Sequence, residues 1–292
     1  MGQRGRSAGS TCDATLELGD VTIVSLCDVE APFPGRLDEV FPRPPRTGWS
    51  RAEERHPGAF AGDRWLLHVR VFVVTIGGHT ILVDAGIGPS GAPGAAWIGR
   101  EGRLPERMDA AGIDPDRIDI VVLTHLHLDH VGWATRASSG EPEARFPKAT
   151  YLLQAADAER SGSSSYHWAI EPLLRAGRLQ TVDGDREIVE GARLVWTPGH
   201  TAGSQSLLVE TDVGGALLWG DVANHPVQVE EPEFCSIGDE DPALIVTTRR
   251  RWIREAKEAG WWVAPSHFPE PFGRLVDHPG GAAWSGPTVT AG

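Results

Sequence analysis

The chain has 292 residues, 40% hydrophobic and 23% charged, a composition typical of a globular protein of one domain. Aspartate and glutamate number 40 against 27 lysines and arginines, and the resulting net charge of −13 disfavours nucleic acid and anionic membranes as partners. The sequence opens without a signal peptide and contains no apolar run long enough to span a membrane, so we expect a cytoplasmic protein.

The N-terminal part of the chain predicts a hairpin followed by an unusual loop. We expect residues 1–12 to be a flexible N-terminus and residues 13–292 to form a single domain. Residues 14–28 alternate apolar and polar side chains around Gly19-Asp20, as in a β-hairpin. Residues 31–64 are rich in Pro and Gly with isolated aromatics, and loops of this length are usually functional or disordered. We interpret this stretch as a substrate-loop segment.

The rest of the chain alternates strand and helix patterns. Strands are predicted at residues 65–76, 79–86, 118–124, 149–154, 193–196, 205–211, 216–221 and 261–267. Helices are predicted at residues 103–113, 167–177 and 241–260. This alternation indicates sheets covered by helices.

Two segments of the chain resemble each other. VFVVTIGGHTILVDAG and SLLVETDVGGALLWGDV both have the order strand, Gly-Gly, strand, Asp, with Asp84 and Asp221 at matching positions. Either two hairpins are alike by chance, or the chain contains two copies of one unit that form two facing sheets. The second interpretation would place both aspartates at equivalent strand ends.

The stretch VVLTHLHLDHVGW concentrates ligand-type side chains at the end of an apolar strand: His125, His127, Asp129 and His130. Alternate residues of an extended segment point to the same side, so these side chains can converge. Imidazole and carboxylate together suit Zn²⁺ or a related metal ion. Further candidate ligands follow other apolar strands: His200 in TPGHT, Asp221 in WGDV and His267 in PSHF.

The order H-x-H-x-D-H, TPGHT, GD and a late SH, over about residues 77–267, resembles the metallo-β-lactamase superfamily of dinuclear metallohydrolases. The resemblance implies an α/β fold, an αββα sandwich of two facing mixed β-sheets flanked by helices, with the metals at one sheet edge. It implies a first metal held by His125, His127 and His200, a second held by Asp129, His130 and His267, and Asp221 as the bridge. The segments ILVDAGIG and TPGHTAGSQSLLVE are similar to the lactonase and methyl parathion hydrolase-like branch.

This resemblance implies hydrolysis by a hydroxide held between two metals about 3.5–4 Å apart. We expect two Zn²⁺ per chain, with Fe or Mn as alternatives. Asp129 would also accept the proton of the hydroxide and pass it to the leaving group. Asp84 would support a ligand histidine or the ligand loop, or only cap a turn. A serine nucleophile is not expected, because no G-x-S-x-G pattern follows an apolar strand, as a nucleophile elbow would require.

Aromatic residues near the motifs predict the kind of substrate. Those in loops beside the ligands can form a wall for a neutral hydrophobic lactone, aryl ester or phosphotriester, whereas Trp196 and Trp219 on strands are expected in the core. The candidate wall residues are Phe33, Phe41, Trp49, Phe60, Trp97, Trp133, Phe268 and Phe272. The lactonases that the chain resembles have a tyrosine three positions after the bridging aspartate, where this chain has Asn224, followed by His225. An amide can donate a hydrogen bond to an oxyanion, and a histidine can transfer a proton, so both are candidate catalytic residues.

Other functions stay open at this point. Imidazole and carboxylate sites also bind iron, so a mononuclear sulfur dioxygenase-like enzyme is one alternative, and a thioester hydrolase is another. A noncatalytic metal-binding protein is an alternative of a different class. A nuclease is disfavoured because the one basic run, TTRRRWIREAK, is more simply a solvated helix face. The expected partner is a small molecule, and a homodimer is left open.

Overall fold

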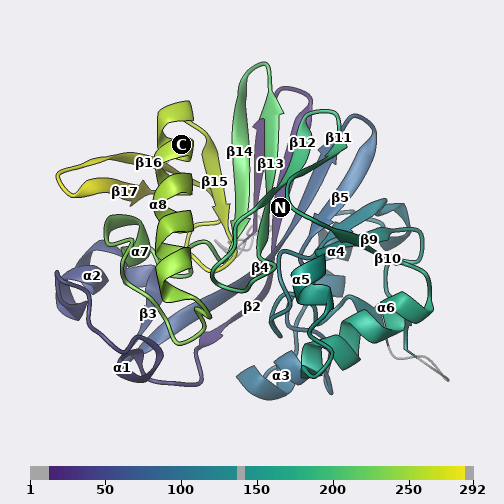
Figure 1. Cartoon of the computed structure of the whole chain (residues 1–292), viewed down its shortest axis with the longest axis horizontal. Coiled ribbons are helices and arrows are strands. Elements are labelled where there is room, and N and C mark those ends of the chain that lie inside the picture. Colours follow the sequence, from purple (N-terminus) through teal and green to yellow (C-terminus); the bar gives the residue numbers. More distant parts are fainter. Residues whose placement is uncertain (1–12, 137–141, 287–292) are drawn as a thin grey trace, which may run out of the picture.

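The structure is a computed structural model that describes residues 13–136 and 142–286. The predicted flexible N-terminus at residues 1–12 therefore lies outside the described residues. Two β-sheets lie face to face, with helices packed on their outer sides, as Figure 1 shows. The predicted αββα sandwich of mixed sheets is confirmed.

The first sheet comes from the N-terminal half of the chain. Its strands, in spatial order, are β1 (Ala14–Leu18), β2 (Val21–Pro32), β4 (Arg64–Ile76), β5 (His79–Val83), β6 (Ile120–Val122), β9 (Thr150–Gln154) and β10 (Leu179–Val182), and β3 (Phe60–Ala61) pairs with β4. Its outer side is covered by α4 (Leu104–Ala110) and by a π turn (Tyr166–Ile170) that runs into α6 (Glu171–Arg175). β7 (Thr135–Arg136) and β8 (Glu143–Ala144) form a small separate ribbon.

The second sheet comes from the C-terminal half. Its strands, in spatial order, are β11 (Arg186–Val189), β12 (Ala192–Trp196), β13 (Gln205–Thr211), β14 (Gly214–Gly220), β15 (Trp262–Pro265), β16 (Gly273–His278) and β17 (Gly281–Ser285). Its outer side is covered by α8 (Pro242–Ala259), which begins where Asp241 accepts hydrogen bonds from the N–H groups of Ala243 and Leu244. The helix ends at Gly260, whose φ of +63° favours glycine.

The core between the sheets is built from alternating apolar side chains of both. Ile23, Val74 and Ile81 of the first sheet pack with Leu207 and Leu218 of the second, and all are buried. Side chains alternate across a strand, so each sheet turns one face to the other sheet and the other face to its helices.

The two similar hairpins occupy equivalent places in the two sheets. β4–β5 lies in the first sheet and β13–β14 in the second, and Asp84 and Asp221 follow β5 and β14. Each of these strands has a parallel neighbour, β6 for β5 and β15 for β14. Those neighbours lead to His125 and His267, so three of these strand ends bring candidate ligands to the same edge, and β5 brings Asp84 there. This arrangement favours the two-copy interpretation over chance similarity.

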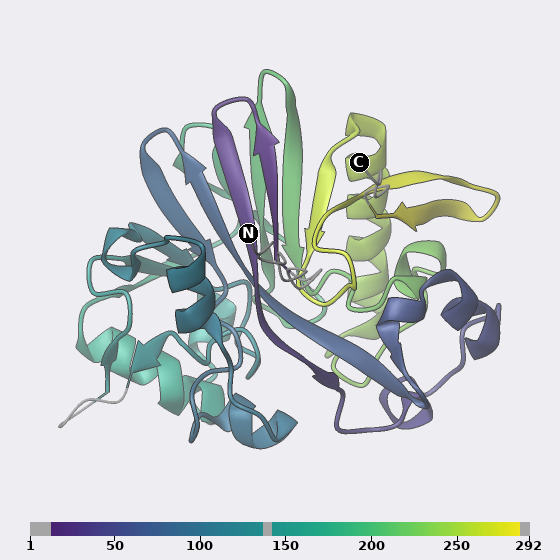
Figure 2. The same cartoon turned by 180° about the vertical axis from the view of Figure 1, so that it is seen from behind.

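The Pro- and Gly-rich segment at residues 31–64 has a fold of its own. β2 and β4 extend past the neighbouring strands of the first sheet, as Figure 2 shows. The connection at their far end contains α1 (Leu37–Val40) and α2 (Trp49–Arg55). Apolar side chains of this segment, including Phe41 and Phe60, are buried against Trp65 and Phe234. The segment is therefore packed against the domain and is not a free surface loop.

Several features differ from the sequence prediction. Trp196, expected in the core, has an exposed fraction of 45%; it is the last residue of β12 and donates its indole N–H to Ala202 O. The hairpin β16–β17 was not predicted. Within the part of the chain that the structure describes, no helix has the length and apolar character needed to cross a membrane.

Candidate metal centre

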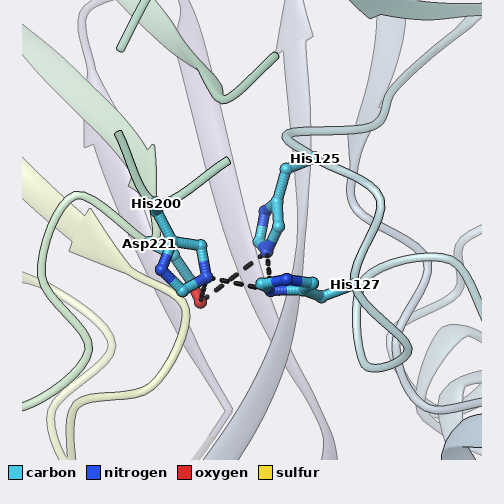
Figure 3. Close-up of side chains that lie close together, drawn as sticks. All are labelled: His125, His127, His200 and Asp221. Carbon is cyan, nitrogen blue, oxygen red and sulfur yellow. Dashed lines mark hydrogen bonds and ion pairs between the residues drawn. The ribbon is translucent and has the colours of Figure 1, made fainter. Parts of the chain in front are cut away.

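One cluster, here called the first ligand group, contains His125, His127, His200 and Asp221, whose ligand-type atoms lie within 4.8 Å of one another (Figure 3). His127 Nδ1 lies 3.0 Å from His125 Nε2 and 2.9 Å from His200 Nε2. Asp221 Oδ2 lies 3.1 Å from His200 Nε2 and 3.8 Å from His125 Nε2. Four side chains from three strand ends therefore point at one place.

A second ligand group contains Asp129, His130 and His267. His130 Nε2 and His267 Nε2 lie 3.2 Å apart, and Asp129 Oδ2 lies 3.6 Å from His267 Nε2. Asp221 Oδ1 lies 3.4 Å from His130 Nε2 and 3.1 Å from His267 Nε2. Asp221 thus turns one oxygen to each group and lies between them, which is the arrangement that the resemblance implied.

The donor set fits metal ions. Zinc–ligand bonds of about 2.0–2.1 Å in tetrahedral geometry place neighbouring ligand atoms about 3.3 Å apart. The distances within both groups cluster around this value. Asp221 Oδ1 is buried and, among the described residues, has no hydrogen-bond donor. A buried carboxylate oxygen without a donor is costly, and a cation between it and the imidazoles would remove that cost.

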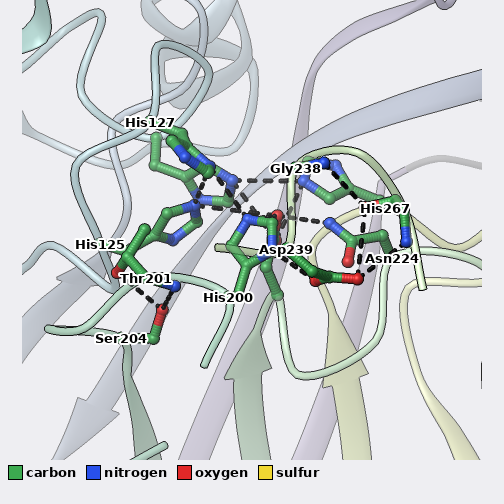
Figure 4. A network of polar contacts seen from close by, with 12 residues as sticks. His125, His127, His200, Thr201, Ser204, Asn224, Gly238, Asp239 and His267 are labelled. Atoms are coloured by element: carbon green, nitrogen blue, oxygen red, sulfur yellow. Dashed lines mark hydrogen bonds and ion pairs between the residues drawn. The ribbon is translucent and has the colours of Figure 1, made fainter. Parts of the chain in front are cut away.

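Hydrogen bonds from the far side of the ring fix the orientation of three of the imidazoles. His130 Nδ1 donates to Asp84 over 2.7 Å, and His267 Nδ1 donates to the carbonyl oxygen of His68 over 2.7 Å. His200 Nδ1 donates over 2.9 Å to Asp239, which belongs to the polar network in Figure 4. Such partners leave Nε2 free to face a metal.

The strand ends and turns explain how the ligands reach the site. His200 lies in a tight turn closed by the hydrogen bond from Thr197 N to Ser204 O, and Gly199 in that turn has a φ of +128°. A Cβ at Gly199 would lie 2.3 Å from the backbone nitrogen of Ile245 in α8. Only glycine fits this close approach, so the TPGHT motif requires its glycine as well as its histidine.

Burial and neighbouring charges shift the pKa values of two ligand histidines in opposite directions. Burial, together with the neighbouring imidazole of His200, lowers the pKa of His127 to about 4, so this ring is neutral at neutral pH and able to bind a metal. Burial opposes protonation of His200 as well, but the carboxylates of Asp221 and Asp239 raise the pKa of this histidine to about 9. The carboxylates therefore attract positive charge to the place where the imidazoles converge, and a metal ion would supply it.

A pocket of about 280 Å³ opens onto both ligand groups. Its polar lining consists of His127, Asp129, His200, Asp221, His267, Asn224 and Ser236. Its apolar lining consists of Phe33, Val40, Trp65, Leu67, Trp97, Leu128 and Ile237. Phe33 stacks on Trp65 with ring centroids 5.4 Å apart and meets Trp97 edge-on at 5.1 Å. The pocket is therefore an aromatic cleft whose floor carries the ligand groups.

Only some of the predicted wall aromatics reach this pocket. Phe33 and Trp97 line it, and Trp65, which the sequence did not single out, forms part of the same wall. Phe41, Trp49 and Phe60 pack behind the wall around His225, while Trp133, Phe268 and Phe272 lie in the core.

Asn224 and His225, three and four positions after Asp221, occupy different surroundings. Asn224 lines the pocket, and its side-chain amide donates to Asp221 Oδ2 over 2.5 Å. His225 is buried among aromatic rings, outside the pocket lining, and accepts a hydrogen bond at Nδ1 from Val227 N over 3.3 Å. Burial lowers the pKa of His225 to about 3, so the ring is neutral. The structure brings Asn224 to the site and places His225 behind its wall.

An αββα sandwich with two histidine- and carboxylate-rich groups at one edge defines a class of metal-binding proteins. The family model of the Metallo-beta-lactamase superfamily matches residues 64–280, and the chain belongs to this superfamily.

Relatives and solved structures agree with this assignment. The chain is 31% identical over 150 residues to an N-acyl homoserine lactonase of Bacillus sp., covering 51% of this chain and 56% of the relative. It is 28% identical over 180 residues to the N-acyl homoserine lactonase AttM of Rhizobium radiobacter, covering 54% of this chain and 65% of the relative. The matched part thus spans little more than half the length of the first of these curated relatives.

Two solved structures are similar over nearly the whole chain. One is the hydrolase AbOPH in the beta lactamase superfamily, with a TM-score of 0.80, 24% identity and coverage of 97% of this chain and 99% of that one. Another is AidC, a dizinc quorum-quenching lactonase, with a TM-score of 0.77, 18% identity and coverage of 94% and 97%. At these identities the likeness shows the fold.

Proposed function

We propose that the chain is a dinuclear metal-dependent hydrolase that cleaves an ester-type bond in a neutral hydrophobic substrate such as a lactone, aryl ester or phosphotriester. The observation that carries this proposal is the position of Asp221, which turns one oxygen to each ligand group at the floor of an apolar pocket. Relatives that hydrolyse homoserine lactones support the same reaction class.

We propose that the first ligand group holds one ion and the second group the other, with Asp221 shared. Two Zn²⁺, or Fe or Mn in their place, would lower the pKa of a bound water toward neutrality and polarise a substrate oxygen. Asp129 lines the pocket and also belongs to the second group, so its carboxylate can reach both the nucleophile and the substrate. We assign it the proton transfer from the nucleophile to the leaving group.

The pocket lining supports a neutral substrate. Among the described residues, its lining contains no lysine or arginine, so beyond the metal site itself no long cationic side chain is present to bind an anionic group of a substrate. Phe33, Trp65 and Trp97 offer aromatic surface, which packs against flat or long apolar groups. Ester-type substrates with an aryl or long acyl group fit this lining, and nucleotides do not.

The test combines metal content with turnover. Purified protein is assayed on an aryl ester, a lactone, a thioester and an aryl phosphotriester before chelation, after chelation and after adding Zn²⁺ back. We expect close to two metal ions per loaded chain, loss of hydrolysis on chelation and recovery with metal. A single ion at saturation, or oxygen uptake in place of hydrolysis, would refute the dinuclear hydrolase.

A further inference from the structure

Asp157 is a fully buried carboxylate that lies outside the ligand motifs. It follows β9, in the short helix α5 (Ala155–Ala158), and its exposed fraction is 0%. Asp157 Oδ2 accepts hydrogen bonds from Leu126 N over 2.9 Å and from the hydroxyl of Thr201 over 3.0 Å. Asp157 Oδ1 accepts from Gly203 N over 2.9 Å. One side chain is thereby bonded to two different loops.

Those loops carry the histidines of the first ligand group. Leu126 lies between His125 and His127, and Thr201 directly follows His200. The first loop leaves β6 in one sheet, and the second leaves β12 in the other. The carboxylate therefore joins the two halves of the molecule at the point where their imidazoles must converge.

The surroundings of Asp157 hold it close to both loops. A Cβ at Gly203 would lie 2.7 Å from the Asp157 side chain, so glycine permits the approach. Arg160 lies 4.0 Å from Asp157 Oδ1 and also pairs with Glu240, whose N–H donates to His200 O over 3.1 Å. Asp157 is thus also linked to the turn that carries His200 through Arg160 and Glu240.

We propose that Asp157 is a positioning residue that sets the affinity of the first ligand group for its metal ion. The proposal rests on the proposed metal-dependent function, but it concerns ion binding and can be tested without turnover. Within the described residues, the hydrogen bonds that Asp157 accepts come from Leu126 N, Gly203 N and the Thr201 hydroxyl and not from a candidate ligand side chain, so its effect must pass through the two loops. It aligns His125 and His127 with His200 before the ion binds.

The main variant is Asp157→Asn. Asparagine has the same shape but one acceptor oxygen, so its NH₂ group would face either Leu126 N or Gly203 N, donor against donor. Zn²⁺ binding is measured on the metal-free protein by competition with a chromophoric chelator, which gives two stepwise constants. We expect one constant to weaken by about 10–100-fold, as for other partners that orient metal ligands, with the other changed by less than about threefold.

The matched control is Asp28→Asn. Asp28 is equally buried and accepts from Ile87 N, Arg103 N and Leu104 N. It also accepts from the indole N–H of Trp133, three positions after His130, but it makes none of these bonds to the backbone of a loop of the first ligand group. We expect this variant to lower the thermal stability of the metal-free protein while leaving both Zn²⁺ constants unchanged. If Asp157→Asn behaves in the same way, the carboxylate only stabilises the fold and the proposal is wrong.

Two further variants identify the affected ion. In a His267→Ala background, which removes a ligand of the second group, the weakening caused by Asp157→Asn should persist, and in a His200→Ala background it should largely disappear. Thr201→Val, which removes one of the three hydrogen bonds, should weaken the same ion by a smaller factor and serves if Asp157→Asn does not fold. Equal weakening of both ions would overturn the proposal. Normal Zn²⁺ binding without hydrolysis would instead refute the proposed function alone.

Discussion

The side-chain amide of Asn224 donates a hydrogen bond over 2.5 Å to Oδ2 of Asp221, the carboxylate that lies between the two ligand groups. The backbone N–H of Asn224 is itself bonded to Gln228 over 2.7 Å, which fixes the residue in place. One of the two amide protons is thus bonded to a carboxylate and is not free for a substrate oxygen. We therefore expect Asn224 to orient Asp221 more than to polarise the substrate.

The first prediction concerns substrate preference. Because Asn224, which cannot transfer a proton, replaces the tyrosine of the lactonases that the chain resembles, acyl-homoserine lactones should be poorer substrates than an aryl ester or activated phosphotriester with a better leaving group. One positioned donor contributes about 10²–10³ in rate, so the difference should be visible in kcat/KM measured on one preparation. Equal kcat/KM for a long-chain homoserine lactone and an aryl ester, with no loss in Asn224→Ala, would show that the missing tyrosine says nothing about substrate.

The second prediction concerns Asp221→Ala. Each oxygen of this carboxylate faces one ligand group, so the substitution should weaken both ions, and metal content should fall well below two per chain. Loss of metal-derived stabilisation worth several kcal/mol should reduce kcat by about 10³-fold or more. Asp212→Ala, which removes an exposed carboxylate in the β13–β14 turn, is the control and should behave as wild type. Retention of two tightly bound ions in Asp221→Ala would rule out a bridging role.

The third prediction concerns the aromatic wall. Phe33→Ala and Trp97→Ala should raise KM for aryl esters, because each removes ring surface from the pocket lining. A contact of about 0.5–1.5 kcal/mol corresponds to roughly 2–10-fold in kcat/KM. Metal content should stay unchanged, and a small acetate ester serves as the control substrate. If aryl and acetate esters lose activity equally, the wall does not bind substrate.

The fourth prediction concerns His225→Phe. The ring of His225 packs edge-on against Phe41, Trp49 and Phe60, so phenylalanine should preserve the packing. A general acid contributes about 10²–10⁴ in rate, and we expect nothing of this size to be lost, since His225 lies outside the pocket lining. The pH–rate profile of wild type and variant should coincide. Disappearance of one limb of that profile would establish His225 as the proton donor.

The sequence by itself determined the fold class and the candidate ligands. Each ligand motif follows an apolar strand, and strand ends are visible as local patterns, so H-x-H-x-D-H, TPGHT, GD and SH could be read in order. The hairpin around Gly19-Asp20 and the helix over residues 241–260 were predicted for the same reason, since turn residues and caps act on close neighbours.

Only the tertiary structure decided which residues support and surround the ligands. Asp157 meets Leu126 and Thr201, 31 and 44 positions away, and Asp239 meets His200 across 39 positions, so no local pattern marks these pairs. Whether a tryptophan on a strand is buried likewise depends on what covers its face, which is why Trp196 is half exposed. Long-range contacts of this kind follow from how the two sheets pack, and packing is a property of the whole chain.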